Sequence, residues 1–135
     1  MRHLPTIAGV VLGLAFVAFS CIYFFKLVNM PPPPEGSPAA LFMGALYPTG
    51  YLDFVKALEL IGGILIAIPF TRRIGLLILG PIIINILAFH GFITNGAGLF
   101  DPPIVIIVAL TLYLVWVDRC AFVSFIRGKK AVHTP

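Results

Sequence analysis

Four polar residues inside long apolar stretches are the side chains with the clearest potential for chemistry. Lys56 and Glu59 lie three residues apart in one stretch, so on a helix they occupy neighbouring positions of one face and can form an ion pair. Asn85 and His90 lie in the next stretch along the chain. Together they offer an ammonium, a carboxylate, an amide and an imidazole, which are groups that hydrogen-bond to a carbonyl or exchange protons with a bound molecule.

The composition of the chain indicates that lipid surrounds these stretches. Of the 135 residues, 60% are hydrophobic and 10% are charged, whereas a soluble domain has about 25% charged residues. A chain of this length cannot bury so much apolar surface in its own core. The net charge of +4 comes mainly from basic residues that flank the apolar stretches, so it indicates membrane orientation and not a nucleic-acid partner.

The apolar stretches predict an all-α, four-helix transmembrane bundle that forms a single domain. Each crossing requires about 20 apolar residues as a helix. The first connection contains four consecutive prolines, which cannot be helical, and then Ser37-Pro38, a typical start for a short interfacial or re-entrant helix. The predicted segments are transmembrane helices at 4–28, 53–70, 74–93 and 102–123, an outer loop with the short helix at 29–52, and a basic tail at 124–135.

The basic residues lie on one side of this bundle, and they predict its orientation. Those at the N-terminus, in the turn between the second and third helices and after the fourth helix are Arg2, Arg72, Arg73, Arg119, Arg127, Lys129 and Lys130. The opposite side carries acidic residues instead, namely Glu35, Asp53 and Asp101. Because loops rich in Lys and Arg stay in the cytoplasm, both termini are predicted to be cytoplasmic.

In this arrangement the four polar residues lie at similar depths in the outer half of the membrane. Glu59 lies about 9 Å below the outer end of its helix, and His90 and Asn85 lie roughly one and two turns below theirs. They predict a polar ligand-binding pocket roofed by residues 37–47. The alternative is structural, with Lys56 and Glu59 paired to fix helix packing and the other two bonded between helices. His90 has no second axial candidate, which argues against haem.

Small residues predict where the helices approach most closely. Gly9 and Gly13 form a GxxxG pattern in the first helix, and Gly62 and Gly63 offer a similar notch in the second. Gly91 is a further candidate in the third helix. The two cysteines of the chain form no CxxC or other metal-ligand spacing, so no metal site is predicted.

The motifs around these residues resemble those of a known family of membrane proteins. Residues 50–63 carry a Lys-x-x-Glu-x-x-Gly-Gly pattern, residues 85–90 carry Asn-x4-His, and a proline-rich segment with residues 42–46 precedes them. This arrangement resembles the DoxX-like family over residues 11–125. The resemblance implies a four-helix protein of the bacterial cytoplasmic (inner) membrane that belongs to a redox or electron-transfer complex. One branch is named for a subunit of a thiosulfate:quinone oxidoreductase, but the lack of paired cysteines argues against thiol-redox activity here.

Three functional hypotheses follow. The first is an accessory subunit of a membrane redox complex that binds a quinone or a lipid in the outer-leaflet pocket and is not catalytic on its own. The second is a purely structural subunit of a larger respiratory or photosynthetic complex. The third is a small-molecule transporter, ranked last because no inverted repeat is visible. The predicted partners are membrane lipids and other membrane-protein subunits.

Overall fold

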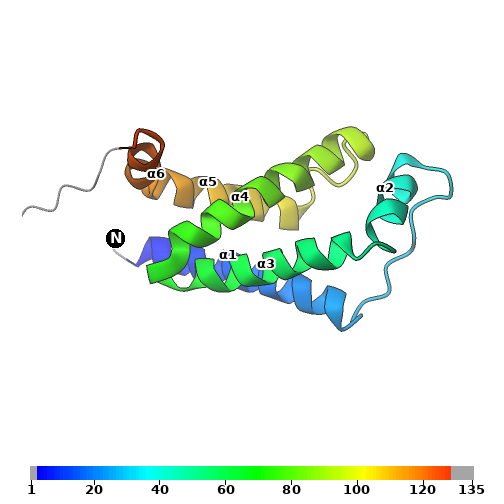
Figure 1. Cartoon of the computed structure of the whole chain (residues 1–135), viewed down its shortest axis with the longest axis horizontal. Helices are drawn as coiled ribbons and strands as arrows, with labels where there is room; N and C mark the ends of the chain where they lie inside the picture. The colour runs from blue at the N-terminus through cyan, green and yellow to red at the C-terminus, as the bar shows by residue number, and fades with distance from the viewer. Residues whose placement is uncertain (1–2, 129–135) are drawn as a thin grey trace, which may run out of the picture.

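The computed structural model describes residues 3–128, and every regular element in that part of the chain is a helix (Figure 1). The elements are α1 (Leu4–Phe24), α2 (Pro38–Leu46), α3 (Tyr51–Ala67), a 3₁₀ turn η1 (Pro69–Thr71), α4 (Arg72–Ala88), a π-helical turn η2 (Phe89–Ile93), α5 (Pro102–Val117) and α6 (Arg119–Ile126). The chain therefore has the all-helical fold that its long apolar stretches predict.

A central antiparallel pair, α1 and α3, holds the other helices together. α4 packs against α3 and α5 packs against α1, whereas α4 and α5 have little contact with each other. In Figure 1 the start of α1, the turn between α3 and α4, and α6 lie at one end of the molecule, and α2 lies at the other. We call these the α6 end and the α2 end.

The core is apolar and lies where the helices cross. Its most deeply buried side chains come from four helices: Leu12 and Phe16 of α1, Ile66 of α3, Leu79 of α4 and Leu114 of α5. Many other large apolar side chains are exposed on the outer faces of the helices. Such a surface is typical of helices whose outer faces are covered by lipid or by other proteins.

Glycines allow the helices to approach this closely. A Cβ on Gly9 would lie 2.9 Å from the carbonyl oxygen of Ile66, and one on Gly13 would lie 2.8 Å from the Cβ of Ala67. On the other face of α3, a Cβ on Gly75 of α4 would lie 2.7 Å from the Ile66 backbone nitrogen. These distances are too short for any side chain, so glycine is required where α1 and α4 pack on α3.

The remaining packing candidates behave differently from one another. Gly62 faces Leu79, and Gly63 faces Gly13 and Phe16, so both lie in helix interfaces. A Cβ added to Gly91 would meet no atom within 4 Å, so the prediction that Gly91 packs against a neighbour is wrong. The α4 glycine that does pack, Gly75, lies in the opposite half of the helix.

Two of the described helices are long and apolar enough to cross a membrane. They are Leu4–Phe24 and the continuous helical segment Pro69–Ile93, which includes Pro81 without a break large enough to divide it. A third is obtained if α5 and α6 are counted together as one broken span. α3 is shorter, with 17 residues, and it carries Asp53, Lys56 and Glu59.

Two predicted helix limits are wrong. The first predicted helix extends to residue 28, but α1 ends at Phe24, and Lys26 then has a positive φ of 51° that a helix cannot contain. The fourth predicted helix is continuous to residue 123, but it breaks at Asp118 and α6 continues at an angle of 68° to α5. The short helix α2 does lie in the first connection, and its N-cap Ser37 accepts a 3.2 Å hydrogen bond from the Ala40 amide.

Candidate functional site

Lys56 and Glu59 form the ion pair that their spacing predicts. The Lys56 Nζ atom lies 3.0 Å from Glu59 Oε2, and Glu59 is only 4% exposed. α3 presents both side chains near the α1–α3 interface, where Glu59 belongs to the buried face that also contains Gly62, Gly63 and Ile66. A carboxylate in such a place needs an opposite charge, and the ammonium of Lys56 supplies it.

The polar contacts continue from this pair toward the α2 end along the same interface. The Ser20 hydroxyl donates a 3.3 Å hydrogen bond to the Lys56 carbonyl oxygen, and the Tyr23 hydroxyl donates one of 2.7 Å to Asp53 Oδ1. The Lys56 ammonium also lies 5.8 Å from the centre of the Tyr23 ring. These groups bond to one another across α1 and α3, so they fix the register of the two helices.

Asn85 lies elsewhere, on an exposed face of α4. It lines a half-open groove of about 200 Å³ together with Phe42 from α2 and Ala88, Phe89, Phe92 and Ile93 from the end of α4 and η2. The rings of Phe42 and Phe89 are 5.2 Å apart, so α2 covers one side of the groove. The groove therefore combines aromatic surface with a single amide group.

His90 points toward the loop that follows η2. Its Nδ1 atom lies 2.8 Å from the Ile86 carbonyl oxygen, one turn earlier in its own helix. Its ring meets the Phe89 ring edge-on at 5.3 Å, and its Cδ2 atom lies against Gly98. The imidazole is thus held by its own helix and by the 94–101 loop.

The structure thus brings Lys56 and Glu59 together and gives Asn85 and His90 different surroundings. Lys56 and Glu59 are joined at the α1–α3 interface, Asn85 lies in the groove beside α2, and His90 faces the loop; within residues 3–128 no hydrogen bond or ion pair joins these three places. Asn85 lies on α4 and His90 lies in the π-helical turn η2, and the two side chains leave this segment toward different neighbours, the groove and Gly98.

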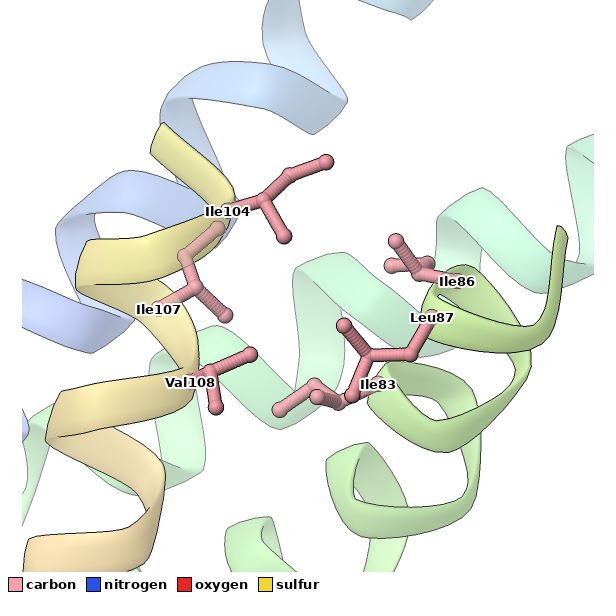
Figure 2. Close-up of a pocket in the computed structure, with 6 residues that line it drawn as sticks. All are labelled: Ile83, Ile86, Leu87, Ile104, Ile107 and Val108. Atoms are coloured by element: carbon pink, nitrogen blue, oxygen red, sulfur yellow. The ribbon is translucent and has the colours of Figure 1, made fainter. Parts of the chain in front are cut away.

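A second cavity lies between α4 and α5, and it is entirely aliphatic. Figure 2 shows Ile83, Ile86 and Leu87 of α4 opposite Ile104, Ile107 and Val108 of α5. Its volume of about 20 Å³ has room for little more than one water molecule. This gap is too small to hold a ligand.

Sequence reasoning misses one charged cluster. Asp118, at the break between α5 and α6, is 4% exposed and lies 3.1 Å from Arg72 Nε and 3.3 Å from Arg73 Nε. The sequence does contain a signal, because Asp118 is the one acidic residue among the basic residues at this end of the chain. Its partners lie on α4, so spacing along α5 cannot identify them.

The described part of the chain thus holds the polar cluster around Lys56 and Glu59, the charged cluster around Asp118, and the groove beside α2. Comparison of the sequence and the fold with protein-family models, with curated proteins and with solved structures gives no match. The DoxX-like resemblance accordingly stays a prediction that rests on the two motifs and their spacing.

Proposed function

We propose that this chain is a DoxX-like accessory subunit of a bacterial membrane redox complex and that it binds a quinone head ring in the groove beside α2. In this proposal α1, α3, α4 and α5 cross the inner membrane, both termini are cytoplasmic, and the α2 end faces outward. The proposal is supported by two or three helices of sufficient length and apolarity. It is also supported by the position of Arg72, Arg73 and Arg119 at the α6 end.

The ligand assignment rests on the groove beside α2. Small-molecule sites are concave, mainly apolar, and contain a few polar groups that orient the ligand. Here Phe42, Phe89 and Phe92 supply the flat apolar surface that a quinone ring requires, and Asn85 supplies an amide that can donate to a ring carbonyl. The volume of about 200 Å³ suits a single ring, with an isoprenoid tail extending into lipid.

The other predicted site residues take structural roles in this proposal. Lys56 and Glu59 lie at the α1–α3 interface and fix its register, while His90 anchors the 94–101 loop. The chain's own part is then to bind and orient the ring, and a partner subunit supplies the electrons. Proton exchange through Glu59 or His90 is not required.

The test is a binding titration of the detergent-purified protein with a short-chain ubiquinone. Asn85→Leu removes the amide and fills the groove, so we expect at least about ten-fold weaker binding, in line with the loss of one hydrogen bond from a desolvated site. Two matched controls, Asn29→Leu in the exposed first connection and His90→Phe, are expected to bind as the unchanged protein does. Equal affinity of the Asn85→Leu variant would refute the quinone site.

A purely structural subunit is the second candidate, and the contacts at the α1–α3 interface favour it. Within residues 3–128 no buried side-chain polar atom lacks a hydrogen-bond partner, so the polar groups are accounted for without a ligand. Extraction in mild detergent, followed by mass analysis of proteins and small molecules, separates the two. A stoichiometric assembly without quinone supports the structural role, and quinone that co-purifies with the chain supports the first proposal.

A further inference from the structure

The α6 end exposes aromatic and aliphatic side chains beside arginines. α6 turns away from α5 by 68°, which is the geometry of a helix that leaves a bundle and lies across its end. Trp116, at the end of α5, is 65% exposed, and Phe125 and Ile126 of α6 are more exposed still. Arg119 and Arg127 are exposed on the same short segment.

The arginines of this surface are not neutralised within the described chain. Asp118 is already held by Arg72 and Arg73. The other four carboxylates of the sequence, Glu35, Asp53, Glu59 and Asp101, belong to the α2 half of the molecule. Arg119 donates a 2.8 Å hydrogen bond to the Trp116 carbonyl oxygen, and its guanidinium lies 4.2 Å from the centre of the Trp116 ring.

We propose that the end of α5 and α6 together bind the headgroups of anionic phospholipids. The proposal rests on the membrane placement given under Proposed function. A tryptophan and exposed aliphatic side chains at the α6 end are typical of a surface that lies at the boundary between acyl chains and headgroups. Arginines at that level attract phosphate-bearing lipids, and Arg119, held over the Trp116 ring, is oriented for this contact before the lipid binds.

An anionic membrane surface fits these residues better than an acidic protein does. Arg119 and Arg127 flank the apolar side chains of α6, so one short helix carries both the charges and the apolar surface that an interfacial helix requires. Arg72 and Arg73 remain tied to Asp118 and hold the end of α5 in place. Asp118 balances one of these two charges, and Arg73, whose side chain is 63% exposed, adds to the positive charge of this end. Within the described residues, Arg119 and Arg127 are the arginines of the surface that no carboxylate holds.

Trp116 is the sole tryptophan of the chain, so its fluorescence reports directly on this surface. The experiment reconstitutes the full chain into vesicles of phosphatidylcholine that contain increasing amounts of brominated phosphatidylglycerol or brominated phosphatidylcholine. Bromine quenches tryptophan at short range, so the two titrations give the relative affinity of the surface for each lipid. We expect the affinity for phosphatidylglycerol to exceed the affinity for phosphatidylcholine by more than about two-fold. One basic residue at a membrane surface can contribute a factor of roughly five.

Three variants identify the source of the preference. Arg119→Gln combined with Arg127→Gln is expected to weaken it, since Arg73 remains at this end, and the corresponding pair of Lys substitutions is expected to retain it because the charge is kept. An unchanged preference in the double Gln variant would contradict the inference. Lys26→Gln removes a positive charge just after the last residue of α1, far along the bundle from the start of that helix, and is expected to leave the preference unchanged. Equal quenching by both lipids in the unchanged protein would overturn the inference, whereas no quenching by either lipid would overturn the membrane placement itself.

Discussion

Arg72 holds the carboxylate of Asp118 with two hydrogen bonds, although the two residues lie 46 positions apart in the chain. Nε donates to Oδ2 over 3.1 Å, and Nη2 donates to Oδ1 over 3.2 Å. The pair joins the start of α4 to the end of α5, two helices that otherwise have little contact. It therefore closes the α6 end of the bundle, while the same helices leave a small aliphatic gap between them nearer the start of α5 (Figure 2).

Asp118→Asn is expected to destabilise the protein by about 3 kcal/mol. The substitution keeps the size of the side chain but leaves the largely buried guanidinium of Arg72 without its counter-charge, and loss of one partner from a buried ion pair is costly. The free energy of unfolding can be measured by detergent denaturation followed by circular dichroism. Asp101→Asn is the control, because Asp101 is exposed and makes no side-chain capping bond to α5. Equal stability of the two variants would contradict the role assigned to Asp118.

Gly13→Ala is expected to cost about 1–3 kcal/mol of stability, the usual range for overpacking. The added methyl group would meet the carbonyl oxygen of Gly63 and the Cβ of Ala67, and a backbone oxygen cannot move without shifting α3. The free energy of unfolding can again be measured by detergent denaturation followed by circular dichroism. α1 and α3 are expected to separate slightly, which would also weaken the bond from Ser20 to the Lys56 carbonyl.

Gly80→Ala is the matched control for this prediction. Gly80 lies inside α4, and a Cβ there would meet nothing within 4 Å. Alanine has a higher helix propensity than glycine by about 1 kcal/mol, so the variant is expected to be as stable as the unchanged protein or more stable. A loss of stability at Gly80 as large as that at Gly13 would show that helix packing is not what distinguishes the two positions.

Local spacing is sufficient to predict the features that depend on one helix. The Lys56–Glu59 pair follows from a separation of three residues, and the Ser37 cap follows from the residue types at the start of α2. The long apolar stretches likewise identify helices, because backbone groups among apolar side chains must bond within their own segment. These interactions can be inferred from residues that are close in the sequence.

Features that depend on how helices rotate against one another cannot be predicted in this way. Which neighbours Asn85 and His90 each meet depends on which side of α4 packs on α3, and that is set by the contacts of Gly75 and Leu79. Nothing in the sequence distinguishes Gly75 from the other glycines, and only the structure shows that it packs against Ile66. Asp118 is missed for the same reason, since its partners are 45 and 46 residues away.

Substitutions at Lys56 and Glu59 test whether the pair is structural. Glu59→Gln is expected to cost about 3 kcal/mol, because Lys56 loses its partner in a mostly buried position. The double variant Lys56→Met with Glu59→Leu replaces both charges by apolar groups and is expected to cost less than the sum of the single changes. A double-mutant cycle from the unfolding free energies of Lys56→Met, Glu59→Leu and their combination should give a coupling energy of about 1–3 kcal/mol.

The same variants separate a structural role from a part in ligand binding. Glu59 does not line the groove, so the folded Glu59→Gln protein is expected to bind short-chain ubiquinone with unchanged affinity. Additive single-variant costs, with no coupling, would show that the ion pair contributes nothing to stability. Weaker quinone binding by the folded Glu59→Gln variant would show that Glu59 takes part in ligand binding.

Cys120 provides a test of the proposed orientation. It is exposed on α6, whereas Cys21 lies within α1, and both thiols are free. In a Cys21→Ala background, a membrane-impermeant maleimide is expected to label Cys120 in inverted inner-membrane vesicles and not in intact spheroplasts. The reason is that the proposed orientation puts the α6 end, with its arginines, in the cytoplasm.

A second single-cysteine variant completes this test from the other side. Glu35→Cys lies in the exposed connection before α2, and in a background without Cys21 and Cys120 it is expected to react in intact spheroplasts. The two positions should therefore show opposite labelling, because Glu35 belongs to the α2 end and Cys120 to the α6 end. Labelling of both cysteines from the same side would contradict this orientation. The chain would then cross the membrane an even number of times between the two positions, or lie on its surface. The short, charged α3 would be the first segment to question as a span.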